Sequence, residues 1–148
     1  MIDDIFISLQ NLISKRWAVF EDDGISAWLY LTEPNSEKPI ADCWIYNRIP
    51  ISPTEDMGKF EIPLPAISSV TDNDAVYHSI DKEKLSFLWS KNGESVSLFY
   101  ANVSLGFIHE ANQRGYSYHL IEDCTWGNVF DYRLFRRTFL DFIMSCGN

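Results

Sequence analysis

The sequence predicts a single domain, residues 1–148, of the α+β class: an antiparallel sheet of about six strands built from two meanders, with an N-terminal and a C-terminal helix packed on it. The chain has 148 residues, the common size of one domain. Hydrophobic residues make up 46% of it, which excludes a disordered chain. Short β-type runs separated by turn signals fill its middle, and helical spacing appears near both ends.

The first predicted element is an amphipathic helix near the N-terminus. Its apolar residues recur at intervals of three and four, on one stripe: Ile2, Ile5, Phe6, Leu9, Leu12 and Ile13. Asp3 and Asp4 suit its first turn, where negative charge interacts favourably with the helix dipole. The segment has no cationic start and is too polar for a membrane span, so we expect neither a signal peptide nor a membrane partner, and a cytoplasmic location.

Three strands of a first meander are predicted next. Residues 16–21 and 25–32 are β-favouring and flank the tight-turn signal Asp22-Asp23-Gly24. A polar loop with two prolines then leads into a third strand at residues 40–49. Residues 50–75 contain four prolines, so irregular, exposed chain is expected there.

The second meander is predicted from residues 85–90, 95–101 and 105–109. Asn92-Gly93, between the first two runs, is the strongest short hairpin signal in the chain. Asp131 is a suitable N-cap for the final helix, which Gly147 would end. The residues expected on the apolar face of that helix are Leu134, Phe135, Thr138, Phe139, Phe142 and Ile143.

The charge of the chain is acidic and unevenly distributed. There are 21 acidic and 12 basic residues, a net charge of −9, and residues 1–74 carry 13 and 5 of them, a net charge of −8. Such a field repels phosphate backbones and attracts cations, so we expect no nucleic-acid ligand. The functional hypothesis is a non-catalytic protein-binding domain whose first half covers a basic partner surface. For the charge alone, the simpler explanation is favoured, namely that the excess acid only keeps the protein in solution.

Aromatic and acidic residues supply the candidate partner-binding positions. Trp28 and Tyr30, like Trp44 and Tyr46, are two residues apart within a predicted strand, so each pair should share one face of the sheet. That face is either core or an acidic, aromatic binding surface. Arginine and aromatic residues in the later loops are typical of interface hot spots, although they could instead seat the last helix. The candidates are Glu21, Asp22, Asp23, Trp28, Asp42, Trp44, Arg114, Tyr116 and Trp126.

Signals for catalysis are weaker. His109, Glu110 and His119 form the cluster that most resembles an acid/base or metal site, but their spacing does not match HExxH. Structural roles are favoured, with a small hydrolase that uses these residues as an alternative function. The three cysteines have no ligand-like spacing and are predicted to be reduced thiols: Cys43, Cys124 and Cys146. We expect no cofactor and no metal.

Five segments of the second half carry a resemblance: Asn92-Gly93, Leu105-Gly106-Phe107-Ile108, Arg114-Gly115-Tyr116-Ser117, Trp126-Gly127-Asn128 and Asp131. Over this stretch the chain resembles small uncharacterised bacterial proteins, which implies no particular activity. In size, acidity and aromatic content the whole chain is also similar to immunity proteins of bacterial polymorphic toxin systems, which implies an inhibitor that covers its partner and assigns no residue. The remaining alternative is a structural or oligomerising domain, in which a strand edge or aromatic patch pairs two copies.

Overall fold

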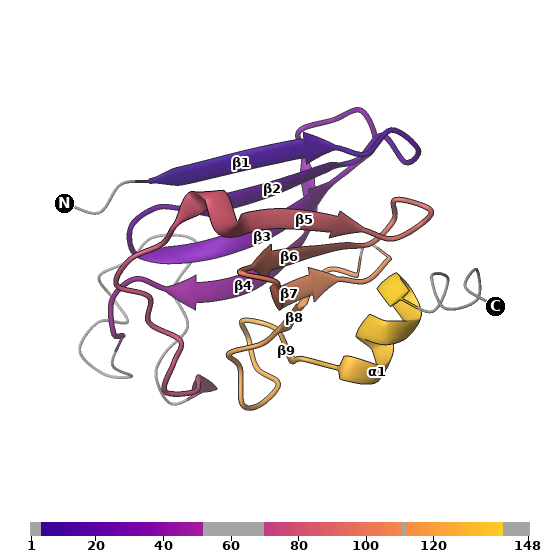
Figure 1. Ribbon diagram of the computed structural model, residues 1–148. Helices are drawn as coiled ribbons and strands as arrows, with labels where there is room; N and C mark the ends of the chain where they lie inside the picture. The colour runs from indigo at the N-terminus through magenta and orange to yellow at the C-terminus, as the bar shows by residue number, and fades with distance from the viewer. Residues whose placement is uncertain (1–3, 52–69, 111, 141–148) are drawn as a thin grey trace.

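Two β-sheets packed face to face form the body of the protein (Figure 1). The computed structural model describes residues 4–51, 70–110 and 112–140. The first sheet has the strand order β1-β2-β3-β4 and the second β5-β6-β7-β8-β9, followed by a short C-terminal helix. The predicted α+β fold, with a six-stranded sheet and a helix at each end, is therefore wrong.

The first sheet is an antiparallel meander. Its strands are β1 (Ile5–Gln10), β2 (Trp17–Asp22), β3 (Ser26–Thr32) and β4 (Pro39–Asn47). The last three are the strands predicted for residues 16–49. The predicted turn between β2 and β3 is also confirmed, because Asp23 Oδ1 accepts hydrogen bonds from the backbone N–H groups of Ile25 and Ser26 at 2.9 and 3.0 Å.

Strand β1 stands where the N-terminal helix was predicted. It pairs with β2, and Ile5 and Ile7 pack in the core between the sheets while Phe6, between them, is 66% exposed. The three-and-four spacing was misleading because it included four apolar residues that are exposed in the structure: Phe6, Leu9, Leu12 and Ile13. The β-branched isoleucines favour the extended chain, since a helix restricts their side chains. Residues 2 and 3 of the predicted helix lie outside the described residues.

The second sheet begins with the predicted hairpin. A 3₁₀ turn, η2 (Lys82–Lys84), leads into β5 (Leu85–Trp89), which pairs with β6 (Val96–Tyr100). The Asn92-Gly93 turn is confirmed, with Gly93 at a φ of 72° and the Ser90 N–H bonded to the Ser95 carbonyl at 3.0 Å. The remaining strands are β7 (Val103–Ile108), β8 (Tyr116–Ser117) and β9 (Asn128–Val129), and the last two pair in parallel.

The C-terminal helix is short and its start is confirmed. Asp131 accepts a hydrogen bond from the Leu134 N–H at 3.0 Å, after which α1 (Tyr132–Phe135) continues into a π-helical turn, η3 (Arg136–Leu140). Phe139 is fully buried against the second sheet. Three of the residues expected in or just after this helix, Phe142, Ile143 and Gly147, lie outside the described residues. Within the described part of the chain, no helix is both long enough and apolar enough to cross a membrane.

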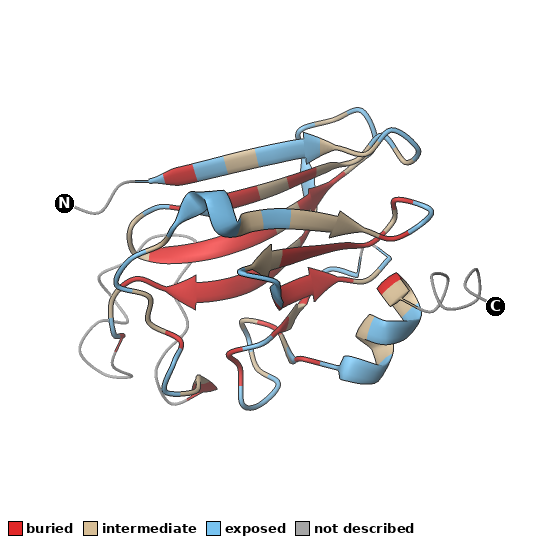
Figure 2. Cartoon of the chain, viewed as in Figure 1, coloured by how far each residue is buried: buried red, intermediate tan, exposed pale blue. Residues whose placement is uncertain are grey.

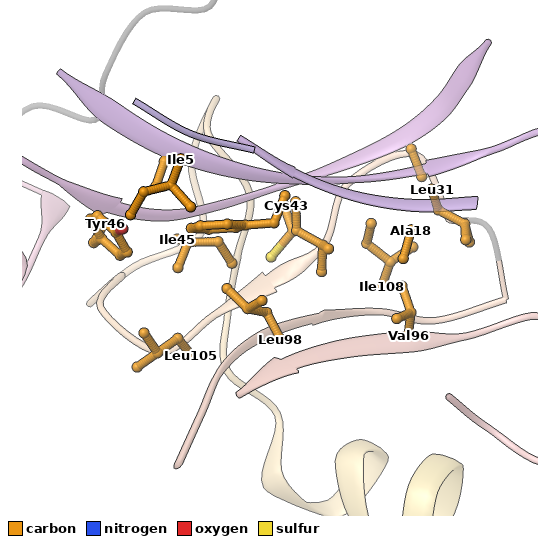
Figure 3. Close-up of a cluster of buried hydrophobic side chains, with 14 residues drawn as sticks. Ile5, Ala18, Leu31, Cys43, Ile45, Tyr46, Val96, Leu98, Leu105 and Ile108 are labelled. Carbon is orange, nitrogen blue, oxygen red and sulfur yellow. The ribbon is translucent and has the colours of Figure 1, made fainter. Parts of the chain in front are cut away.

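The main core lies between the two sheets (Figure 3). Side chains such as Cys43 and Ile45 from the first sheet meet Leu98 and Ile108 from the second. Two smaller apolar clusters cover parts of the outer faces: one around Trp28, Trp44, Val70, Ala75 and Leu120, the other around Phe107, Phe130 and Phe139. The central strands are consequently buried on both faces along much of their length (Figure 2).

An irregularity in the pairing of β3 with β4 changes which aromatic residues share a face. Ala27 pairs with Tyr46 and Trp28 with Trp44, so Ile45 is an extra residue in β4. Trp44 therefore joins Trp28 and Tyr30 in the outer cluster, while Tyr46 enters the main core. The prediction of a shared face is confirmed for 28 and 30 and wrong for 44 and 46.

The chain beyond β4 is not simply exposed, as had been predicted for residues 50–75. Ile51, Val70 and Ala75 are buried, the latter two against the tryptophans of the outer cluster. Thr71 also forms an isolated antiparallel bridge with Leu120. Residues 52–69 of this segment lie outside the described residues.

Candidate partner-binding site

Two adjoining hollows on the outer face of the first sheet form what we call the outer groove. The first, the acidic hollow, has a volume of about 530 Å³, and its main lining residues are Phe6, Trp17, Val19, Glu21, Tyr30 and Glu37. The second, the mixed hollow, has a volume of about 600 Å³, and its main lining residues are Trp28, Tyr30, Asp42, Arg114 and Trp126. Tyr30 and Pro39 line both hollows, so the two hollows adjoin each other.

The acidic hollow follows from the two-residue period of the strands. In β2, Ala18 and Phe20 are fully buried in the main core, so the alternating residues Trp17, Val19 and Glu21 face outward. Pairing then aligns the neighbouring outward residues, with Phe6 opposite Glu21 and Val19 opposite Tyr30. Glu37 reaches the same hollow from the loop between β3 and β4.

The electrostatic character of the acidic hollow is negative. Glu21 and Glu37 line it, and none of its described lining residues is a lysine or arginine. Burial first, and then the carboxylates of Glu21, Asp42 and Asp23, together raise the pKa of Tyr30 to about 12. Negative charge around the Tyr30 hydroxyl disfavours a phenolate and favours a bound cation.

The mixed hollow combines both signs of charge. Burial raises the pKa of the Asp42 carboxyl group, and the guanidinium of Arg114 partly offsets that shift. The backbone holds the two residues together, since the Asp42 N–H donates to the Gln113 carbonyl at 3.0 Å and the Gly115 N–H donates to the Asp42 carbonyl at 2.7 Å. The Trp28 and Tyr30 rings stack with their centroids 6.5 Å apart.

Six of the nine candidate binding residues lie at or beside the outer groove. Trp28, Asp42, Arg114 and Trp126 line the mixed hollow. Glu21 lines the acidic hollow, and Asp23, exposed in the β2–β3 turn, adds to the negative charge at Tyr30. The structure thus brings together residues up to about a hundred positions apart in the sequence.

Asp22 is a structural residue, which corrects its assignment to partner binding. Its side chain is fully buried and forms an ion pair with Arg48 at 2.7 Å. The hydroxyl of Tyr46 donates to Asp22 Oδ2 at 2.7 Å, and the Gly24 N–H donates to Oδ1 at 2.9 Å. Burial and this carboxylate together raise the pKa of Tyr46. No charge of Asp22 is left exposed for a partner.

Trp44 and Tyr116 are likewise packing residues. Trp44 is fully buried, and its indole N–H donates to Asn47 Oδ1 at 3.0 Å. Tyr116 stacks on Phe107 with the ring centroids 4.9 Å apart. Neither residue lines the outer groove.

The three residues of the weaker catalytic hypothesis belong to two different clusters. His109 lies 3.8 Å from Glu110 and hydrogen-bonds through Nδ1 to Thr138 Oγ1 at 3.1 Å. His119 instead bonds to Asp72 and Tyr77. Across residues 4–51, 70–110 and 112–140, no three His, Cys, Asp or Glu side chains are grouped so as to hold a metal ion.

Asp72, His119 and Tyr77 form a chain of hydrogen bonds that sequence reasoning missed. His119 Nδ1 lies 2.9 Å from Asp72 Oδ1, and its Nε2 lies 2.8 Å from the Tyr77 hydroxyl. Such a chain can activate a nucleophile, but here burial first and Asp72 next raise the pKa of Tyr77 to about 12. Because this opposes ionisation and His119 is almost fully buried, we interpret the chain as a structural cross-link.

Two of the three cysteines are described, and both are free thiols as predicted. Burial raises the pKa of Cys43 to about 12, and its Sγ donates to the Tyr116 carbonyl at 3.3 Å. An unreactive packing role follows, because the thiolate is the nucleophilic form. Cys146 lies outside the described residues.

Comparison of the chain with protein-family models, with curated proteins and with solved structures gave no match. The fold and the outer groove define a β-sandwich domain with an acidic, aromatic surface site.

Sequence reasoning did not select four residues that line the groove: Phe6, Trp17, Tyr30 and Glu37. Phe6 had been assigned to a helix and Glu37 to a loop. The alternation of Trp17, Val19 and Glu21 within one short run was the signal that could have placed an aromatic residue and an acid on the same outward face.

Proposed function

We propose that the protein is a non-catalytic binding domain that recognises a basic surface of a protein partner through its outer groove. The observation that supports this most directly is the acidic hollow, in which two glutamates stand beside aromatic side chains and none of the described lining residues is basic. Aromatic rings supply contact area at low entropy cost, and the carboxylates select for positive charge.

The rest of the chain supports the same interpretation. The excess of acid over base in residues 1–74 would draw a basic partner toward the first sheet before contact. The exposed ring of Phe6, on the rim of the hollow, would then become buried. An inhibitor of the immunity type, which covers a basic surface of a toxin, would act in this way.

Association with the partner is expected to depend strongly on salt and on the acidic hollow. The partner would be identified by capture from the native host and purified, and its association rate measured by biolayer interferometry at low and high salt. Raising the salt should slow association, because screening weakens steering. The double variant Glu21→Gln/Glu37→Gln should slow it about tenfold at low salt.

The matched control for this test is Glu83→Gln/Glu110→Gln, which removes the same charge from exposed positions outside the groove. It should change the association rate much less than the groove variant. Equal effects of the two double variants, or association that does not respond to salt, would contradict the proposal.

A second candidate function, an oligomerising domain, is favoured by the edge strand β1. Among the described strands it pairs only with β2, and its sequence, Ile5–Gln10, contains no charge and no proline. Edge strands normally carry such residues to prevent pairing with another chain. Antiparallel pairing about a two-fold axis at Ile7 would place Ile5 of one copy opposite Leu9 of a second copy and cover Leu9, which is 48% exposed.

Under this second hypothesis the chain is expected to form a dimer that strengthens as salt is added, because each copy carries a net charge of −9 and screening weakens their repulsion. Analytical ultracentrifugation of the full chain measures this. Leu9→Lys should give a monomer, while Leu12→Lys, at a position that is 81% exposed in the turn after β1, should remain dimeric. A monomer at all concentrations and salt levels would exclude this function.

A further inference from the structure

We propose that the acidic hollow is a binding pocket for one arginine side chain of the protein partner. This inference rests on the proposed function and specifies the chemical group that the groove recognises. The alternative cation, lysine, becomes an outcome of the test.

The shape of the hollow suits a long side chain with a charged end. Val19 and the ring of Tyr30, directly paired across β2 and β3, form an apolar floor for an alkyl stem. Trp17 and Phe6 also line the hollow, and both belong to strands of the sheet. A pocket formed mainly by strand residues is held in place before the partner arrives, which lowers the cost of binding.

The charges of the hollow suit a guanidinium. Glu21 enters from the end of β2 and Glu37 from the loop that leads into β4, so carboxylates approach from two separate elements. A guanidinium has a planar face that stacks on aromatic rings and a fork of donors that bonds carboxylates in pairs. A lysine ammonium is a point charge that is more strongly hydrated and cannot form both contacts equally well.

The mixed hollow is a poorer site for the same group. Arg114 lines it and already offsets the charge of Asp42. A second guanidinium entering there would meet a like charge. The two hollows therefore differ in the charge that they present to a guanidinium.

The test uses the full chain and three short, otherwise identical peptides whose central residue is arginine, lysine or citrulline. Binding is followed by two-dimensional NMR, with the indole N–H signals of the five tryptophans as reporters. The arginine peptide should bind and shift the Trp17 signal most. Citrulline, which keeps the shape but lacks the charge, should not bind, and lysine should bind about fivefold more weakly.

Variants complete the test. Glu21→Gln and Glu37→Gln should each weaken binding of the arginine peptide about fivefold, which is the effect expected from the loss of one exposed ion pair. Glu83→Gln, at an exposed position outside the groove, should leave its affinity unchanged. Equal binding of arginine and citrulline, equal binding of lysine and arginine, or an effect of Glu83→Gln as large as that of Glu21→Gln would overturn the inference.

Failure of this inference and failure of the proposed function are distinguishable. If the arginine peptide does not bind but a purified basic partner associates in a salt-dependent manner that needs Glu21 and Glu37, the function stands and the arginine pocket does not. If the peptide binds as expected but neither salt nor the groove variants change the association rate of the partner, the pocket stands and the proposed function does not.

Discussion

Replacing Arg48 with methionine is expected to lower the free energy of unfolding by about 3–5 kcal/mol, the loss typical of a broken buried ion pair. The change removes the cation from the fully buried carboxylate of Asp22, which among the described residues would keep its bonds from Tyr46 and Gly24. It also removes the hydrogen bond from Arg48 Nε to the Tyr77 carbonyl, which ties the segment after residue 70 to the first sheet. Urea denaturation followed by tryptophan fluorescence measures the loss.

The control for this variant is Lys38→Met. Lys38 lies 4.0 Å from Glu33, and both side chains are exposed, so its removal should cost less than about 1 kcal/mol. The double variant Asp22→Leu/Arg48→Met should be more stable than Arg48→Met alone, because it leaves no buried charge without a partner. A loss below about 1 kcal/mol for Arg48→Met would show that the pair does not hold the two segments together.

Phe107→Ala is expected to destabilise the protein by a similar amount, about 3–5 kcal/mol. Phe107 is fully buried, and the cluster that seats the C-terminal helix is built around its ring. Four ring centroids lie within 6 Å of its own: Tyr116 at 4.9 Å, Phe130 at 5.1 Å, Phe135 at 5.6 Å and Phe139 at 5.8 Å. Thermal unfolding followed by near-UV circular dichroism measures the loss, because that signal reports aromatic packing.

Val103→Ala is the matched control in the same strand. Val103 is 47% exposed, so its truncation should cost less than about 0.5 kcal/mol. If Phe107→Ala proved no more destabilising than Val103→Ala, the aromatic cluster would not contribute to the stability of the second sheet.

Local signals in the sequence predicted local structure well. The Asn92-Gly93 turn, the turn at Asp23 and the cap at Asp131 each depend on residues within a few positions of one another. The strands that flank these turns were found for the same reason, because turn chemistry and β-type runs agreed.

The arrangement of strands into two sheets could not be predicted, because it depends on contacts between distant residues. The helical spacing of the N-terminal segment arose because four of its apolar residues are exposed, which no pattern reveals: Phe6, Leu9, Leu12 and Ile13. The extra residue at Ile45 follows from how β4 pairs with β3, and it reversed the expected direction of Tyr46.

The sequence predicted an acidic, aromatic binding surface, but it did not predict all of the residues that form it. Glu21, Asp42 and Trp126 were chosen because acids and aromatic residues suit a binding surface, and they do line the groove. Asp22 has the same chemistry and sits next to Glu21, yet the alternation of β2 turns it inward to Arg48, 26 positions away. Two things decide which of these acids is exposed: the direction in which each residue of β2 points, and the presence of an ion-pair residue such as Arg48 far away in the sequence. The local sequence does not identify that residue.

The strand order has a consequence for how the protein folds. In both sheets each strand pairs with the strand next to it along the chain. Most of the connections between paired strands are short, so forming these pairs costs little chain entropy. The links to β8 and β9 are longer. Contacts that join the first sheet to the second, such as Asp42 with Gln113, instead connect residues about seventy positions apart. We therefore expect the two meanders to form before they dock, and their docking, which excludes water from the core around Cys43 and Leu98, to be the slower step of folding.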